Sequence, residues 1–138
     1  MGNSGVPDAK AWLTKAWHDL ETARLVANAQ PPLLDVAVYH CQQAAEKAIK
    51  AFLVHHRQMV ERTHDVEVLV DLAADIEPEI GQLADAADAL TPYASRFRYP
   101  NATFAMEPEP EEFEEAFRQA QAIYQFVIGH LPAEAHPD

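Results

Sequence analysis

The stretch that decides the fold is LDVAVYHCQQAAEKAIKAFLVHH, residues 34–56. Its apolar residues recur at helical spacing, and neither Gly nor Pro interrupts them. At 100° per residue they form one broad side of a helical wheel, made of Leu34, Ala37, Val38, Cys41, Ala44, Ala45, Ala48, Ile49 and Phe52. Many of these side chains are small, which lets a neighbouring helix approach closely. The stretch therefore predicts a long helix that packs tightly against others.

A second amphipathic segment precedes this stretch. We expect a helix from about Asp8 to about Ala29. Asp8 follows Pro7 as a cap, and the QPP sequence at 30–32 stops a helix. The apolar positions repeat every three to four residues, at Leu13, Ala16, Trp17, Leu20, Ala23 and Ala27. That spacing predicts one buried face.

Three further elements are expected after residue 56. Thr63 can cap a short helix that contains Val66, Leu69, Val70 and Ala73. Pro78 starts a longer helix that ends near residues 99–100, and Pro92 should kink it because proline lacks an amide hydrogen. Residues 101–110 are expected to form a loop. A last helix follows, with the apolar series Phe113, Phe117, Ala120, Tyr124, Val127 and Leu131.

Composition limits the class of protein. A chain of 138 residues with four glycines and abundant alanine predicts one all-α domain over residues 1–138, with a flexible N-terminus at 1–7 and a flexible tail at 133–138. No apolar stretch is long enough for a membrane span, and residues 1–7 lack the features of a signal peptide. The single cysteine, Cys41, is expected to pack as a small hydrophobe. We therefore expect a cytoplasmic protein without a membrane partner.

The net charge of −12 disfavours general binding to nucleic acid, bulk DNA included, because such a chain repels phosphate backbones at long range. Local basic sites are still possible. Tyr39, Gln43, Lys47, Lys50 and Arg57 fall within about 40° of one line on an ideal helical wheel. These five side chains, the polar stripe, could together bind one anion. The alternative is a solvated face on which Glu46 and Lys50 form an ordinary i,i+4 ion pair.

Two shorter motifs add candidate chemistry. In RFRYP, residues 96–100, the guanidinium groups could bind phosphate and a tyrosine ring could stack on a base. Alternatively, Phe97 packs and the arginines pair with carboxylates. In Thr63-His64-Asp65 an imidazole next to a carboxylate could transfer protons, or the turn could simply cap a helix.

The sequence offers little support for a metal or a cofactor. Glu61-x-x-His64 is the single Glu-x-x-His pair of the di-iron pattern, and it lies in a predicted turn. There is no Gly-rich phosphate loop and no serine in a nucleophile elbow, which argues against common hydrolases and kinases. We expect no metal and no cofactor.

Three motifs occur together in one order: YHCQQAAEKAIKAFL at 39–53, THDV at 63–66 and RYP at 98–100. With the opening WHDLETA at 17–23, they resemble the HEPN (higher eukaryotes and prokaryotes nucleotide-binding) domain over nearly the whole chain. The resemblance implies a compact up-and-down bundle of four long helices plus a short helix. It also implies a homodimer, often encoded beside a minimal nucleotidyltransferase as a toxin–antitoxin pair. By position, the polar site of the family would comprise Gln43, Lys47, Lys50, His64, Asp65, Arg98 and Tyr99.

The sequence departs from the nuclease members of the family, which carry an Arg followed four to six residues later by His. No histidine follows Arg96 or Arg98 at that distance, and the spacing from Arg57 to His64 lies in the wrong place. We therefore predict a non-catalytic HEPN binding module that engages a nucleotide, a nucleotidyltransferase partner or both. One alternative is a metal-independent RNA-cleaving toxin that uses His64 with Arg96 or Arg98. The other is a structural interaction protein without a ligand.

Overall fold

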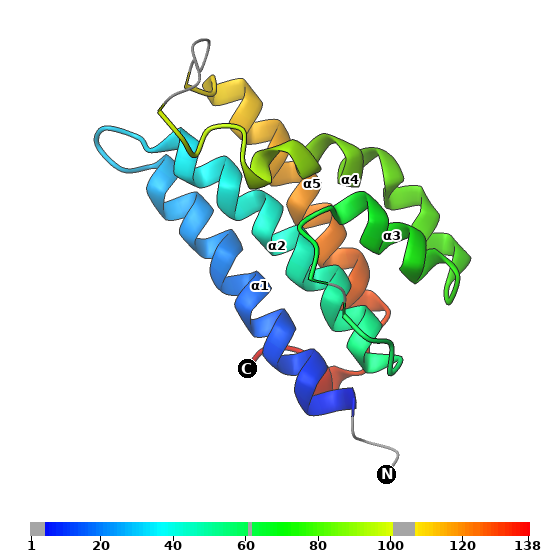
Figure 1. Ribbon diagram of the computed structural model, residues 1–138. Coiled ribbons are helices and arrows are strands. Elements are labelled where there is room, and N and C mark those ends of the chain that lie inside the picture. Colours follow the sequence, from blue (N-terminus) through cyan, green and yellow to red (C-terminus); the bar gives the residue numbers. More distant parts are fainter. Residues whose placement is uncertain (1–4, 61, 101–106) are drawn as a thin grey trace.

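The computed structural model describes residues 5–60, 62–100 and 107–138, and within these ranges the regular structure is entirely helical. Three helices are long: α1 (Gly5–Ala27), α2 (Leu34–His55) and α5 (Pro110–Gly129). Figure 1 shows α1 and α2 side by side, with α5 behind α2 and the helices of residues 66–90 on the side away from α1. The predicted all-α helical bundle is confirmed.

The shorter elements are α3 (Val66–Ala74), η1 (Pro78–Leu83), α4 (Ala84–Leu90), η2 (Thr91–Ala94) and η3 (Ala133–Ala135), where η marks a 3-10 helix. The sequence predicted one long helix from Pro78 to residues 99–100, but the structure divides this segment into η1, α4 and η2. A proline stands in the first turn of each flanking 3-10 helix, and Pro92 cannot donate the amide hydrogen that would continue α4. Most of the predicted 101–110 loop lies outside the described residues.

Helix α2 is buried on nearly all sides. It packs most extensively on α1 and α5, and it also contacts α3 and η2. The predicted apolar side is buried except at Leu34, which is half-buried, and Gln42 is buried beside it. Gln43, Glu46 and Lys50, which the predicted stripe and ion pair placed on the polar side, are buried as well. The expectation that these polar side chains face either solvent or an open site is therefore wrong for most of the helix, because it has neighbours on more sides than its apolar pattern required.

The start of the bundle differs from prediction. Helix α1 begins at Gly5 rather than near Asp8, and a Cβ atom at Gly5 would lie 2.7 Å from the backbone oxygen of His55. Glycine therefore permits the close approach of α1 to the end of α2. At the other end of the chain, Ala135 is fully buried and His136 Nε2 lies 2.8 Å from the backbone oxygen of Ile128.

Cys41 is buried, as predicted, and burial raises the pKa of its thiol to about 12. None of the helices in the described ranges combines the length and the apolar character that crossing a membrane requires.

Candidate functional site

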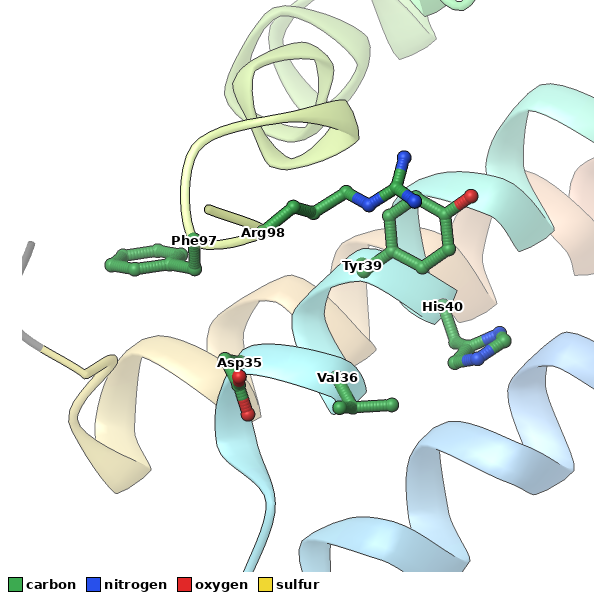
Figure 2. A pocket seen from close by; sticks show the side chains of 6 residues that line it. All are labelled: Asp35, Val36, Tyr39, His40, Phe97 and Arg98. Atoms are coloured by element: carbon green, nitrogen blue, oxygen red, sulfur yellow. The ribbon is translucent and has the colours of Figure 1, made fainter. Parts of the chain in front are cut away.

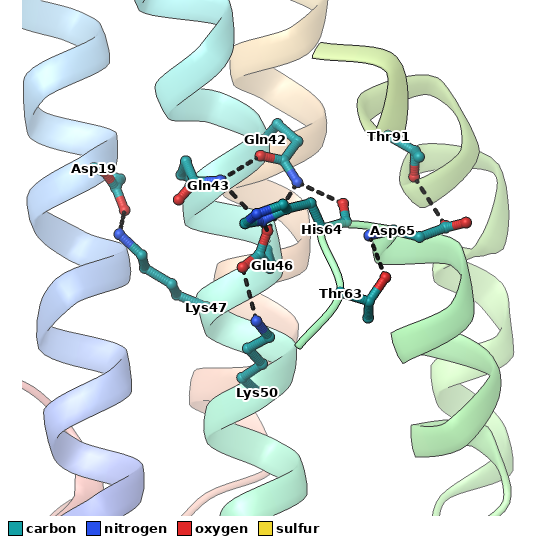
Figure 3. A network of polar contacts seen from close by, with 10 residues as sticks. All are labelled: Asp19, Gln42, Gln43, Glu46, Lys47, Lys50, Thr63, His64, Asp65 and Thr91. Atoms are coloured by element: carbon teal, nitrogen blue, oxygen red, sulfur yellow. Dashed lines mark hydrogen bonds and ion pairs between the residues drawn. The ribbon is translucent and has the colours of Figure 1, made fainter. Parts of the chain in front are cut away.

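Glu46 lies at the centre of a buried polar cluster on α2 (Figure 3). Its Oε1 atom accepts a hydrogen bond from Gln42 Nε2 at 3.1 Å and lies 2.9 Å from His64 Nδ1. Its Oε2 atom accepts a hydrogen bond from Lys50 Nζ at 2.8 Å. Gln43 Nε2 donates to Gln42 Oε1 at 2.7 Å. The structure therefore gathers three predicted site residues, Gln43, Lys50 and His64, around one carboxylate.

This cluster is electrostatically satisfied. Burial raises the pKa of Glu46, but the hydrogen bonds from Lys50, His64 and Gln42 outweigh burial, so the pKa lies below its ordinary value. Lys50 is only 6% exposed, and its ammonium nitrogen lies 5.5 Å from the centroid of the Trp12 ring. The i,i+4 pair of Glu46 and Lys50 is thus present, but it is buried rather than solvated. Lys50 is not available to an external anion.

Lys47 forms a second ion pair, which crosses from α2 to α1. Its Nζ atom lies 2.7 Å from Asp19 Oδ2, and the other oxygen of Asp19 lies 2.7 Å from His40 Nδ1. Asp19 is buried, whereas Lys47 and His40 are partly exposed. The second lysine of the predicted stripe is therefore also neutralised by a carboxylate. Arg57 lies beyond the end of α2, so the stripe does not continue to it as one helical line.

The turn before α3 is a capping arrangement. Asp65 Oδ1 accepts a hydrogen bond from the amide of Val68 at 3.3 Å and one from Thr91 Oγ1 at 3.5 Å. Thr63 Oγ1 accepts from the amide of Asp65 at 3.0 Å. The predicted cap, Thr63, is therefore wrong by two residues, and Asp65 caps α3. Asp65 thus turns to α3 and Thr91 while the neighbouring His64 side chain, 70% exposed, turns to Glu46.

A shallow pocket opens between the first half of α2 and the chain after η2 (Figure 2). Its volume is about 280 Å³, and its lining residues are Asp35, Val36, Tyr39, His40, Phe97 and Arg98. The Arg98 guanidinium carbon lies 4.5 Å from the centroid of the Tyr39 ring and 5.8 Å from that of the Tyr99 ring. Tyr99 is 57% exposed. Arg98 and Tyr99 therefore lie beside α2, where Arg98 meets Tyr39 rather than either lysine of the stripe.

Arg96 has a different environment from Arg98. Its Nη1 atom lies 3.5 Å from Glu112 Oε2, which also accepts a hydrogen bond from the Tyr93 hydroxyl at 2.6 Å. Phe97 stacks on the Tyr93 ring, with 6.0 Å between centroids. The alternative in which Phe97 packs and the arginines pair with carboxylates therefore describes Arg96 and not Arg98.

The residues required for RNA cleavage by the predicted route are not brought together. His64 is held at Glu46, whereas Arg98 is held at Tyr39, seven positions earlier on α2. Seven residues of an α-helix span about 10 Å along the axis. Arg96 pairs with Glu112 on α5. His64, Arg96 and Arg98 thus have three different partners in the part of the chain that the structure describes.

Three residues that organise the site were missing from the predicted set: Glu46, Asp19 and His40. The sequence pattern indicates Glu46 only as the partner of Lys50 in a solvated pair. The sequence could have indicated Asp19, because it is a charged residue at the same helical spacing as the buried positions Ala16 and Ala23 of α1. A charge on a buried helix face requires a partner. Sequence spacing alone does not indicate which one.

The described residues contain no group of three or more His, Cys, Asp or Glu side chains placed to hold a metal ion. Glu61, a member of the Glu-x-x-His pair considered above, lies outside them.

Comparison with known proteins gives two kinds of match. The HEPN domain profile matches residues 9–131. The crystal structure of TT1696 from Thermus thermophilus is 31% identical, with a TM-score of 0.72, covering 95% of this chain and 100% of that one. The crystal structure of ST0689, an archaeal HEPN homologue, is 23% identical with a TM-score of 0.70, covering 88% of this chain and 96% of that one, and so supports the fold alone. No curated protein sequence matches the chain.

Proposed function

Because the chain belongs to the HEPN domain family, we propose that it is a HEPN binding module that recognises a nucleotide at the pocket beside Tyr39 and Arg98. The family is nucleotide-related in general. The choice of this pocket rests on the environment of Arg98.

Arg98 is the cation of the predicted site that remains open to a ligand. Lys47 and Lys50 are each bound to a carboxylate, and Arg96 contacts Glu112. No carboxylate of the described residues forms such an ion pair with Arg98, which instead lies on the Tyr39 ring. A guanidinium group binds phosphate through two parallel hydrogen bonds while its face stacks on an aromatic ring. This arrangement carries the proposal.

The remaining groups fit the same ligand. Tyr99 is exposed next to Arg98 and offers a ring on which a base can stack. Asp35 places a carboxylate in the pocket lining, so a phosphate is attracted at the Arg98 end and repelled at the Asp35 end. The charges of the pocket therefore favour one orientation of the nucleotide.

Isothermal titration calorimetry of the purified chain with a panel of ribonucleotides tests the proposal. Binding is expected for the wild type, and Arg98→Ala should weaken it at least 10-fold, because a hydrogen bond to a charged group contributes about 1.5–3 kcal/mol. Arg118→Ala is the matched control, since Arg118 is an exposed arginine on α5 that pairs with Glu115. Equal binding by wild type and Arg98→Ala would contradict the proposal. No binding to any nucleotide would instead favour the structural interaction protein without a ligand.

We also propose that the chain forms a homodimer and associates with a minimal nucleotidyltransferase in a toxin–antitoxin-like pair. Support comes from family membership and from large apolar side chains exposed on α1, Trp17 at 42% and Leu25 at 66%. Sedimentation analysis should give the mass of a dimer, and Leu25→Glu should shift it toward the monomer. A small nucleotidyltransferase reading frame beside this one, whose product copurifies with the chain, would support the partner. A monomeric wild type would contradict the first part, and the lack of such a neighbour would contradict the second.

A further inference from the structure

His40 is the titratable residue of the pocket that the proposed function leaves without a role. Its Nδ1 atom lies 2.7 Å from Asp19 Oδ1, and Asp19 is 6% exposed. A carboxylate accepts hydrogen bonds, so this contact places the imidazole hydrogen on Nδ1. The neutral ring then presents Nε2 as a hydrogen-bond acceptor. Asp19 thereby fixes which of the two ring nitrogens carries the hydrogen.

Lys47 strengthens this assignment. Its ammonium group lies 2.7 Å from the other oxygen of Asp19 and compensates the negative charge of the carboxylate. Each oxygen of the Asp19 carboxylate therefore has its own partner, Oδ1 the His40 ring and Oδ2 the Lys47 ammonium group. Lys47 and Asp19 act through His40 and do not line the pocket themselves.

His40 and Arg98 lie on two sides of one aromatic ring. Figure 2 shows Tyr39 between the Arg98 guanidinium and the His40 imidazole. The Arg98 guanidinium carbon is 4.5 Å from the Tyr39 centroid, and the Tyr39 and His40 centroids are 5.4 Å apart. Within the described residues no protein group forms a hydrogen bond with His40 Nε2. Because His40 and Arg98 line the same pocket, this acceptor is the group of His40 that we assign to a ligand bound at Arg98.

The pocket offers a particular set of polar groups. Arg98 donates and is positive, whereas His40 Nε2 and the Asp35 carboxylate accept hydrogen bonds. The complementary ligand has an anion at one end and hydroxyl donors at the other. A ribose phosphate has both. The volume of about 280 Å³ is near the lower limit of small-molecule sites and suits a sugar phosphate better than a whole nucleotide.

We propose that the pocket is a ribose-phosphate subsite in which His40, positioned by Asp19, accepts a hydrogen bond from the ribose 2′-hydroxyl and so selects ribonucleotides over 2′-deoxyribonucleotides. The inference rests on the proposed function, since Arg98 must bind the phosphate. The 2′-hydroxyl is the group that distinguishes the two classes of nucleotide.

Calorimetry with matched pairs, such as ATP with 2′-deoxyATP and GTP with 2′-deoxyGTP, tests the proposal. The wild type should bind the ribonucleotide about 3- to 10-fold more tightly, the range that one neutral hydrogen bond provides. His40→Leu should bind both members of a pair equally, and His40→Gln, which keeps an acceptor, should retain part of the preference. His18→Leu, which changes an exposed histidine of α1, should leave the preference intact.

The outcomes separate this inference from the proposed function. Equal binding of both members by the wild type, with binding still weakened at least 10-fold in Arg98→Ala, would overturn the role of His40 and leave the nucleotide site in place. No binding of either member would overturn both. If His40→Leu does not fold, the ¹⁵N chemical shifts of His40 in the wild type give a second test. They should show Nδ1 protonated and Nε2 shifted on addition of ATP, and an unchanged Nε2 would overturn the inference.

Discussion

Glu46 and Lys50 show how burial changes the meaning of a familiar sequence pattern. The i,i+4 spacing predicts their ion pair, and the structure contains it. Spacing alone predicts a solvated pair, however, whereas their side chains are only 4% and 7% exposed. The covering residues Trp12 and His64 come from distant parts of the chain. Sequence therefore predicted the pair but could not predict its environment.

Removing one member of this pair should be costly. Lys50→Met leaves the Glu46 carboxylate buried without its cation, so we expect the free energy of unfolding to fall by about 3 kcal/mol or more. Urea denaturation followed by circular dichroism measures the change. Lys10→Met is the control, because Lys10 pairs with Asp138 at the surface and its loss should cost at most about 1 kcal/mol. Similar losses for the two variants would contradict the description of the Glu46 cluster.

The same cluster predicts a dependence of stability on pH. The pKa of Glu46 is lower in the folded chain than its ordinary value of about 4.3. This contribution to stability is therefore complete above that value and is lost as the pH falls through the folded pKa. The free energy of unfolding of the wild type, relative to Glu46→Gln/Lys50→Met, should be constant at neutral pH and decrease below about pH 4.3. A difference that does not vary between neutral pH and the acid range below the folded pKa would contradict the lowered pKa.

At the scale of elements, the long helices could be predicted and the divided segment could not. Residues 34–56 carry enough periodic apolar positions to define α2 within one residue at its C-terminal end. Between Pro78 and Ala94 the apolar spacing is also helical, but local hydrogen bonding and two prolines produce two 3-10 helices around α4. Periodicity does not distinguish these helix types at short length.

The cap of α3 provides a test at this scale. Asp65→Ala removes the acceptor for the amide of Val68 and should lower the free energy of unfolding by about 1 kcal/mol. Nucleotide affinity should remain unchanged, because Asp65 faces α3 and Thr91 rather than the Arg98 pocket. Asp71→Ala, an exposed change on the same helix, is the control and should alter stability by less than about 0.5 kcal/mol. Loss of nucleotide binding in Asp65→Ala would show that Asp65 belongs to the binding site and would contradict its assignment as a cap alone.

At the scale of the whole molecule, six of the seven residues of the predicted polar site divide among three places, while the seventh, Asp65, caps α3. Gln43, Lys50 and His64 meet at Glu46, Lys47 meets Asp19, and Arg98 with Tyr99 lies at the pocket beside Tyr39. The motifs group these residues as one site. They could not identify the division, because the contacts of His40 with Asp19 and of Arg98 with Tyr39 join helices and segments that no spacing rule relates. In this account the first two places hold the bundle together and the third binds the ligand.

The most direct test of that claim is to titrate the ¹⁵N-labelled chain with the ribonucleotide that binds most tightly in calorimetry. The amide chemical shifts are recorded during the titration. We expect the largest changes at residues 35–40 and 97–99, with small changes around Lys50 and His64. Changes concentrated around Lys50 and His64, with residues 35–40 and 97–99 unaffected, would contradict it.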